Sequence, residues 1–435
     1  MKKKLLVAAA ACALTAATAV PALALENEFH GAFTTFYDLS NYSGSAAGGN
    51  GVISDDSSSE NYFVQRFRLN YNAKASDNVK LVSRFEFDFN FWGNSAYGFN
   101  PDGTTTNRGG GGAVGADTVN METKNIYLDL SYPAIDAKIG MMAHNDAFKG
   151  LLFDGDMAGI LLGHNYSNAG VSAGFFRLND SNDGDAIGKK TNDLFLLEGK
   201  YSVNKDVKVG AGYYYIMDKS NTNPVAFRDA KVHTVGLNAE GKIGPVAVNG
   251  LVMKQFGDLN ATDNAKGWAA NVGVKVPVAG GTLRSEFLYV TGGDKALYVA
   301  QGIGGTEGGQ FYDSEMTMLG RNKYATTIDN ALIYDVNNNN EGVIMGTIGY
   351  DYSFSDKLAT SANVGFAAIA DDAAGRGIAR GDSDYLGTEV NAETNYSLTP
   401  NVTLGARAGY VFLGDYFAND PDNIYDVKLI ARYNF

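Results

Sequence analysis

Hydrophobic and polar residues alternate along most of this chain. From about residue 61 onward, apolar side chains stand at every second position, as in Phe85, Phe87, Phe89 and Phe91, and the last twelve residues, 424–435, repeat the pattern. Successive side chains of a β-strand point to opposite faces, whereas a helix would repeat every 3.6 residues. The pattern therefore predicts an all-β protein whose strands have one apolar and one polar face.

The connections between the predicted strands alternate between short and long. Eight short ones lie near residues 76–78, 133–135, 167–169, 203–206, 241–245, 277–281, 355–357 and 399–401. Nine longer stretches rich in Gly, Asn and Asp lie at residues 43–60, 93–120, 144–157, 179–192, 218–230, 257–266, 292–341, 370–383 and 414–422. Strict alternation gives 18 strands in an antiparallel, up-and-down order, with both termini at the short-turn end.

This asymmetry is typical of a transmembrane β-barrel, in which closure leaves no unpaired strand edge in lipid. No run after the amino-terminal segment is apolar for the roughly 18 residues that a spanning helix needs. Tyr71, Tyr201, Tyr352 and Tyr396 each precede a short turn, as expected of an aromatic girdle at the membrane surface. A soluble sandwich is the competing interpretation of the Phe-rich strands.

The strand count depends on the connection at 292–341. It contains two apolar segments, 315–319 and 331–335, which can be read as an extra hairpin above the membrane. Sixteen strands is therefore the alternative count. Either count implies an aqueous channel unless a loop fills the barrel.

The amino terminus has the features of a signal peptide. Lys2, Lys3 and Lys4 precede an apolar run, and Ala22-Leu23-Ala24 supplies a small-x-small cleavage site. We assign residues 1–24 to a signal peptide cleaved near Ala24, and residues 25–435 to one barrel domain. Cys12, the one cysteine of the chain, falls in the removed segment, so neither disulfides nor thiolate chemistry is expected.

The charge balance narrows the partners. The chain carries 48 acidic and 35 basic residues, a formal net charge of −13, and removing the three lysines of the signal makes it more acidic. A nucleic-acid partner is not expected of such a chain. The expected surroundings are lipid outside the barrel and water within it.

The carboxy-terminal strand, which ends on Phe435, resembles the last strand of Gram-negative outer-membrane porins. The resemblance extends from the signal peptide to this final aromatic residue, and the overall organisation of the chain is similar to that of deltaproteobacterial porins. It implies a location in the outer membrane and homotrimers that pass ions and small hydrophilic solutes by passive diffusion. It also implies a protein that is not an enzyme and needs no cofactor.

Inward-facing charged residues of both signs are the candidate pore lining. They are Arg66, Arg68, Lys80, Arg84, Glu86, Asp88, Glu393 and Arg407, and the same alternation places Lys254 inside. A hairpin centred on Asp77 would pair Arg66 with Asp88, Arg68 with Glu86 and Arg84 with Asn70, and the turn before Pro400 would pair Glu393 with Arg407. These pairs either stiffen the wall or form a basic ladder that acts on passing ions.

The connection at 144–157 is the candidate constriction loop, with polar residues His144, Asp146, Lys149, Asp154 and Asp156. It also contains Leu151, Leu152 and Phe153, which an external loop surrounded by water has little reason to carry. It resembles the third loop of trimeric porins, which folds into the barrel, although the Pro-Glu-Phe-Gly-Gly string of many members is absent. A lid packed against a neighbouring subunit is the alternative.

Other chemistry finds little support. The four histidines are scattered without metal-ligand spacing, and no Gly-x-Ser-x-Gly motif is present. The scattered histidines disfavour an outer-membrane hydrolase, whereas a surface-layer protein would need neither the alternating connections nor the terminal strand. Two further hypotheses keep the barrel: a sheath for a multihaem electron carrier, which needs an unobstructed interior, and a substrate-selective channel.

Overall fold

The computed structural model describes residues 25–41, 60–92, 121–180, 187–219, 229–299, 311–321, 331–333, 335–371 and 381–435. The proposed signal peptide, 1–24, lies outside these residues. The strands are β1 (Glu26–Ser40), β2 (Glu60–Ser76), β3 (Val79–Phe91), β4 (Met121–Tyr132), β5 (Ile135–Asn145), β6 (Asp154–Asn165), β7 (Ala169–Asn179), β8 (Asn192–Ser202), β9 (Val207–Asp218), β10 (Ala230–Ile243), β11 (Val246–Asp258), β12 (Trp268–Val278), β13 (Gly281–Val290), β14 (Val343–Ser353), β15 (Leu358–Ala368), β16 (Tyr385–Ser397), β17 (Val402–Leu413) and β18 (Ile424–Asn434). A short 3-10 helix, η3, covers Gly293–Lys295.

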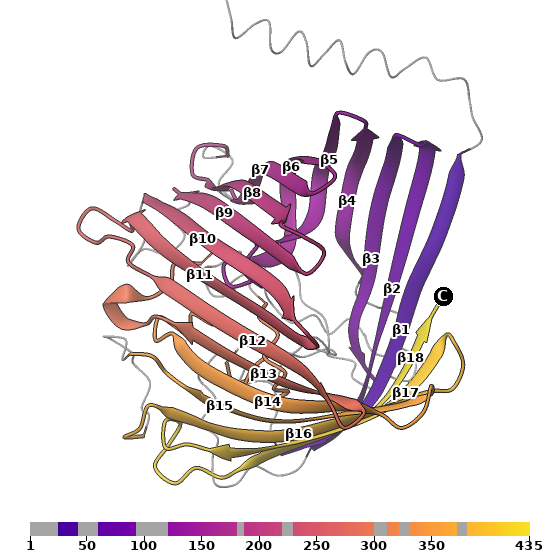
Figure 1. The fold of residues 1–435 in the computed structure, drawn as a ribbon, viewed down its shortest axis with the longest axis vertical. Helices are drawn as coiled ribbons and strands as arrows, with labels where there is room; N and C mark the ends of the chain where they lie inside the picture. The colour runs from indigo at the N-terminus through magenta and orange to yellow at the C-terminus, as the bar shows by residue number, and fades with distance from the viewer. Residues whose placement is uncertain are drawn as a thin grey trace, which may run out of the picture.

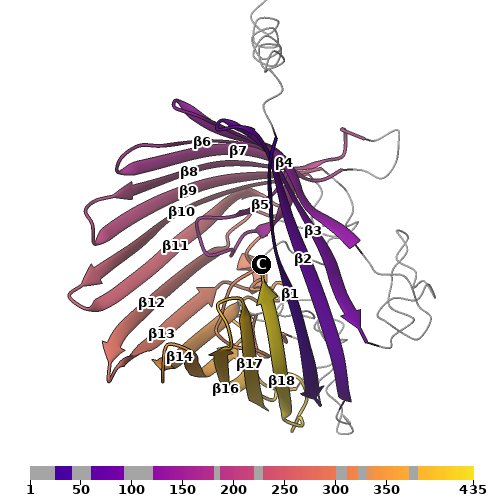
Figure 2. The same cartoon turned by 90° about the vertical axis from the view of Figure 1, so that its right-hand side faces the viewer.

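These strands form one closed antiparallel sheet. Each strand pairs with its neighbours in sequence, and β1 pairs with both β2 and β18, so the last strand closes the barrel against the first (Figures 1 and 2). The predicted all-β barrel of 18 strands is confirmed. Within the described residues, no helix is long and apolar enough to cross a membrane.

The extra hairpin, the alternative considered for the connection between β13 and β14, is not formed by the described residues. Residues 315–320 and 331–333 meet through a single parallel bridge, between Gly320 and Ile333, and form no antiparallel strand pair. Met316, Met318 and Leu319 are fully buried, so this segment does not stand in solvent. The alternative count of sixteen strands is therefore wrong, because these apolar residues pack inside the barrel and form no strand pair of their own.

Short and long connections alternate as predicted. The short ones join β2 to β3, β4 to β5 and each later pair in turn, ending with β16 and β17. Tyr201 and Tyr396 are outward-facing and exposed near these turns, and the Tyr71 ring stacks on Phe29 of β1. All of these features lie at the end of the barrel where both termini of the sheet are found.

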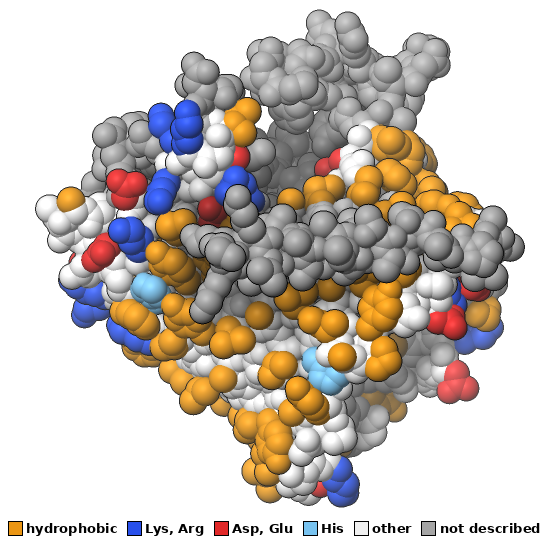
Figure 3. Space-filling view, turned by 90° about the horizontal axis from the view of Figure 1, so that it is seen from above, with side chains coloured by type: hydrophobic (Ala, Val, Ile, Leu, Met, Phe, Trp, Pro, Cys, Tyr) orange, Lys and Arg blue, Asp and Glu red, His pale blue; other side chains and the backbone are white. Residues whose placement is uncertain are grey.

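The two faces of the wall differ. Outward-facing residues are apolar and exposed, as in Leu237 at 62% exposure, whereas their inward-facing neighbours are polar or packed against inserted loops. Figure 3 shows hydrophobic side chains across the middle of one side of the molecule and charged side chains toward its margins. Such a band is expected where a barrel meets hydrocarbon.

The strand register confirms three of the four predicted pairs. Arg68 lies opposite Glu86, Asn70 opposite Arg84, and Glu393 opposite Arg407. The pair of Arg66 with Asp88 is wrong, because the register shifts between Gln65 and Phe67, and Arg66 lies 3.4 Å from Glu86 of β3.

Lys254 was also assigned to the wrong face. It pairs with Val235 and Trp268 on the outer surface, while its neighbours Met253 and Gln255 are buried inside the barrel. Charge was taken as a sign of the interior, but a lysine near the membrane surface can extend its amine toward water from the outer face.

Candidate functional site

The β5–β6 hairpin leaves the barrel wall near its tip. β4 pairs with β5 as far as Ile126 with Met141, and β7 pairs with β6 as far as Arg177 with Ala158. Beyond these points β5 and β6 continue to pair with each other, from Met142–Met157 to Asn145–Asp154. Residues 142–157, called the tongue below, are therefore a two-stranded extension free of the neighbouring strands on both sides.

Asp146 holds the turn of the tongue together. Its carboxylate accepts hydrogen bonds from the backbone N–H groups of Phe148, Gly150, Leu152 and Phe153, at 2.7–3.1 Å. Burial raises the pKa of Asp146 to about 6, although the four donors act to lower it. Asp146, a candidate polar residue of the constriction loop, is 4% exposed and turned into its own loop, so it does not face the pore.

Apolar residues of the tongue pack on the inner wall. Phe148, Leu151, Leu152 and Phe153 are almost fully buried, and the rings of Phe148 and Phe153 meet the ring of Tyr214 on β9 edge-on. A phenylalanine in this position needs room, and glycines on β9 and β10, Gly212 and Gly236, face the Phe148 ring. The tongue thus lies against the interior of β9 and β10.

Polar contacts fix the same position. The Tyr214 hydroxyl accepts a hydrogen bond from the Ala147 N–H at 2.7 Å and donates to Glu198 on β8 at 2.7 Å. His144, on β5, lies with Nε2 3.6 Å from the same Glu198 oxygen and stacks on Phe176. The predicted loop residue His144 therefore belongs to a strand and contacts the wall.

Lys149 reaches across the interior from the tip of the tongue. Its backbone has a φ of 63°, in the left-handed region, and Gly150 follows with a φ of 74°. This turn directs the Lys149 amine to Asn249 on β11, at 2.8 Å, and to Glu286 on β13, at 2.7 Å. The tip is thereby tied to strands far from β5 and β6 in sequence.

A second segment, residues 311–321 of the β13–β14 connection, also enters the barrel and is called the inner segment below. Tyr312 donates to the Glu286 oxygen that Lys149 contacts, at 2.7 Å, and Glu315 lies 3.0 Å from Arg284 of β13. Burial and the Glu286 charge raise the pKa of Tyr312 well above its ordinary value, so its hydroxyl stays a donor. One wall carboxylate thus joins tongue and inner segment.

Glu389 of β16 anchors the other end of the inner segment. Its fully buried carboxylate accepts the backbone N–H groups of Thr317, Met318 and Leu319 at 2.6–3.0 Å, and also the Thr317 hydroxyl. Sequence reasoning missed Glu286, Glu389 and the inner segment as parts of the site. The available signal was the same as for the tongue: an apolar cluster, 315–319, within a polar connection.

The predicted basic residues gather on the wall formed by β2, β3 and β4. Arg66 lies 3.4 Å from the Glu86 carboxylate, Arg68 hydrogen-bonds to it, and Lys124 of β4 lies 3.8 Å away. Glu86 is 1% exposed while Arg68 is half-exposed, and Lys124 also lies 3.4 Å from Glu122 and 3.3 Å from Asp156. We call Arg66, Arg68, Arg84 and Lys124 the basic wall.

The remaining predicted residues lie in separate places. Lys80 pairs with Asp129 at 3.2 Å, and the buried Arg407 donates twice to Glu393 at 2.6 and 2.8 Å. Arg84 is exposed, and the Asp88 side chain lies outside the described residues. Asp154 is exposed, and Asp156 contacts Lys124 at 3.3 Å, linking the tongue to the basic wall.

Across the part of the chain that the structure describes, no group of three or more His, Cys, Asp or Glu side chains is arranged to hold a metal ion. The polar groups of the interior are instead engaged in ion pairs and in backbone anchoring, as described above.

No protein-family model matches this chain, and no curated protein matches it. Solved structures with the same fold include several proteins of Pseudomonas aeruginosa. OccK9 (OpdG) has 13% identity and a TM-score of 0.59, and OccK5 (OpdH) has 14% identity and a TM-score of 0.55. OpdK, solved with vanillate, has 12% identity and a TM-score of 0.56. Each match covers 94% of this chain and 98% of the other.

Proposed function

We propose that this protein is an outer-membrane channel that selects among small hydrophilic solutes and favours organic anions. The observation that carries the proposal is the insertion of the tongue and the inner segment, joined through Glu286, across from the basic wall. An open barrel of 18 strands would leave a wide aqueous path, whereas inserted loops narrow it. Solutes that pass must then contact charged side chains.

The sign of the selectivity follows from the basic wall. Arg66, Arg68, Arg84 and Lys124 outnumber the three carboxylates beside them, Glu86, Glu122 and Asp156, so the wall presents a small net positive charge to solutes in the interior. A narrow pore amplifies the effect of fixed wall charge on permeating ions. The vanillate bound to OpdK is a small aromatic carboxylate, which makes it a suitable probe for this channel.

The inserted loops also bear on the competing hypotheses. A barrel that sheathes a multihaem carrier needs its interior free, and the tongue packs on the inner faces of β9 and β10. General diffusion through a porin requires no preference beyond size. Selectivity is therefore favoured over both, and the narrowest point of the path is proposed to lie between the tongue and the basic wall.

The test is transport by the purified full-length protein. Single channels in planar bilayers under a salt gradient would give the ion preference, and liposome swelling would compare vanillate with a neutral sugar of similar size. We expect anion preference and faster uptake of vanillate. Uptake that follows solute size, without regard to charge, would identify a general porin instead.

A further inference from the structure

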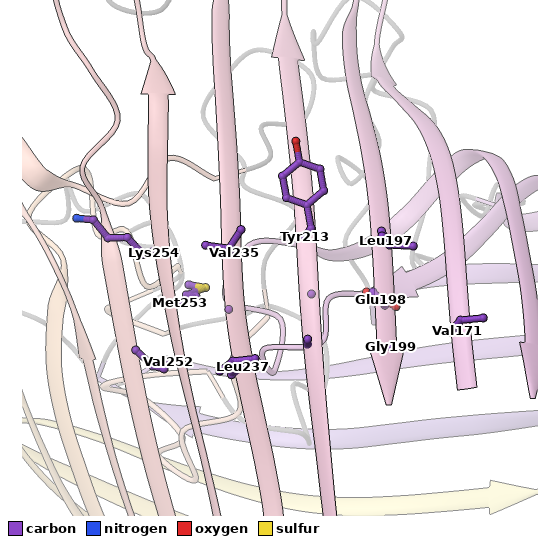
Figure 4. A pocket seen from close by; sticks show the side chains of 13 residues that line it. Val171, Leu197, Glu198, Gly199, Tyr213, Val235, Leu237, Val252, Met253 and Lys254 are labelled. Carbon is purple, nitrogen blue, oxygen red and sulfur yellow. The ribbon is translucent and has the colours of Figure 1, made fainter. Parts of the chain in front are cut away.

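The outer surface of the barrel carries an apolar groove across β7 to β11. Its volume is about 610 Å³, and Figure 4 shows the side chains that border it. Its rims are formed by outward-facing side chains, namely Leu197, Tyr213, Val235, Leu237 and Val252. Its floor is formed by small residues, because Gly199 of β8 pairs with Ala211 of β9.

One end of the groove is polar. Lys254, which the alternation of the sequence predicted to lie inside the barrel, is one of the residues that line this groove on the outer surface. Its amine donates to the carbonyl oxygen of Lys266, beyond the end of β11. The Tyr213 hydroxyl is bonded to Nδ1 of His233 at 2.8 Å. A cation on the lipid-facing surface is costly unless it reaches polar partners near the membrane surface.

A row of neighbouring aromatic rings marks the depth of this end. Phe175, Phe195, Tyr215, His233 and Phe256 lie directly opposite one another on five successive strands, with ring centroids 4.5–6.0 Å apart. The row lies near the strand ends that the long connections join. Aromatic rings of this kind gather where hydrocarbon gives way to head groups.

Lys254 lies two residues before Phe256 on β11, and is therefore one outward-facing position closer to the middle of the barrel wall than the row. It is opposite Val235, whereas Phe256 is opposite His233. The groove therefore begins at a cation close to head-group depth and continues into the hydrocarbon as an apolar channel with a floor of small residues. This is the shape and polarity of a phosphorylated lipid with one acyl chain lying along the wall.

We propose that the groove binds one molecule of the phosphorylated, multiply acylated lipid of the outer leaflet. A phosphate contacts the Lys254 amine, and one acyl chain lies over Gly199 and Ala211. The proposal rests on the outer-membrane location in the proposed function, but not on solute selectivity. A second copy of this chain is a poorer occupant, because the same face on that copy would bring a second Lys254 toward the first.

Native mass spectrometry of the full-length protein in detergent tests the proposal, with diphosphoryl lipid A and phosphatidylglycerol as probes. We expect one lipid A per barrel, bound in preference to phosphatidylglycerol. K254M keeps the apolar stem and removes the charge, and should weaken lipid A binding about fivefold, the effect of one lysine near a charged membrane surface.

G199L tests the acyl site separately. A side chain added at Gly199 meets open space, so the variant should fold and fill the floor of the groove. We expect weaker binding of both lipids. The matched controls are K205M, at a short-turn lysine, and G241L, an outward glycine near the other end of β10 where an added Cβ makes ordinary contacts. Both controls should bind lipid A like the parent.

Three results would overturn the proposal: parental lipid A binding by K254M and G199L, tighter binding of phosphatidylglycerol, or conversion of oligomers to monomers by G199L with lipid binding unchanged. The last would identify the groove as a contact between copies. Anion selectivity is measured separately in planar bilayers. A failure of the lipid-binding proposal can therefore be distinguished from a failure of the proposed solute selectivity. Heat-modifiable gel mobility shows that each variant is folded.

Discussion

Glu86 and Asp146 are both buried carboxylates, yet they have different surroundings. Three cations surround Glu86, whereas backbone N–H groups of its own loop surround Asp146. The first arrangement leaves excess positive charge on the wall, and the second fixes a turn. At the residue scale, the partners of a carboxylate decide whether it acts on solutes or on the backbone.

Replacing Arg66, Arg68 and Arg84 with alanine should shift the channel toward cations. The change removes three positive charges from one wall, and we expect the anion-to-cation permeability ratio to fall about twofold or more. Reversal potentials under a salt gradient provide the measurement. The triple Arg→Lys variant keeps the charge and should behave like the parent. Unchanged potentials in the alanine variant would limit these arginines to a structural role.

The pKa of Asp146 predicts a pH dependence of stability. Because this pKa is about 6 in the folded chain and ordinarily 3.8, the folded state binds the proton more tightly than the unfolded state. The free energy of unfolding, relative to that of D146N, should fall as pH rises from about 4 to about 6, by on the order of 3 kcal/mol, and stay constant above. Thermal unfolding of both proteins across this range would measure it, and a constant difference would contradict the assignment.

At the scale of elements, the tongue combines two hairpin strands that lack outer neighbours with an apolar tip. Its free edges let it turn away from the wall, and burial of the tip holds it against β9 and β10. Each buried leucine or phenylalanine contributes about 1.5–3 kcal/mol relative to exposure, enough to offset the entropy of ordering a short loop.

Replacing residues 146–153 with Asn-Gly should widen the path. Asn145 and Asp154 already pair, so a two-residue hairpin turn can close the strands while the inserted tip is lost. We expect higher single-channel conductance and entry of larger sugars in a swelling assay. The same replacement of the short turn 203–206 is the control. Parental conductance and size limit in the folded tip variant would place the constriction elsewhere.

At the scale of the whole molecule, closure depends on the meeting of the first and last strands. β18 pairs with β1, and the Phe435 backbone exchanges hydrogen bonds with Gly31 at 3.0 and 3.1 Å. The Phe435 ring stacks on Phe67 of β2 and fills the space over Gly31, where any side chain would collide with it. The terminal residue thus contacts both strands beside the seam.

Removing Phe435 should lower the amount of assembled barrel several-fold without changing conductance. The deletion weakens the seam but touches no residue of the interior. Heat-modifiable protein in outer-membrane fractions gives the yield, and planar bilayers give the conductance of what assembles. F412A, which removes an outward aromatic ring at the opposite end of the wall, is the control. Parental levels of folded protein would refute the role of the terminal residue.

The sequence by itself determined the barrel. The period of two, the alternation of short and long connections and the pairs Arg68–Glu86 and Glu393–Arg407 follow from local chain geometry, because a short turn fixes the register of the strands beside it. A single bulge was enough to defeat the same arithmetic at Arg66. The apolar residues 151–153 also marked a loop that needs a dry contact.

The tertiary structure decided what those contacts are. Lys149 contacts Glu286, more than a hundred positions away, and Glu389 of β16 binds the inner segment, which belongs to the β13–β14 connection. Such contacts depend on which strands face one another across the barrel, and no local sequence pattern encodes contacts between residues so far apart in the chain. The outward position of Lys254 had the same origin: alternation separates two faces of a strand, but packing against the tongue and inner segment identifies the one that lies inside.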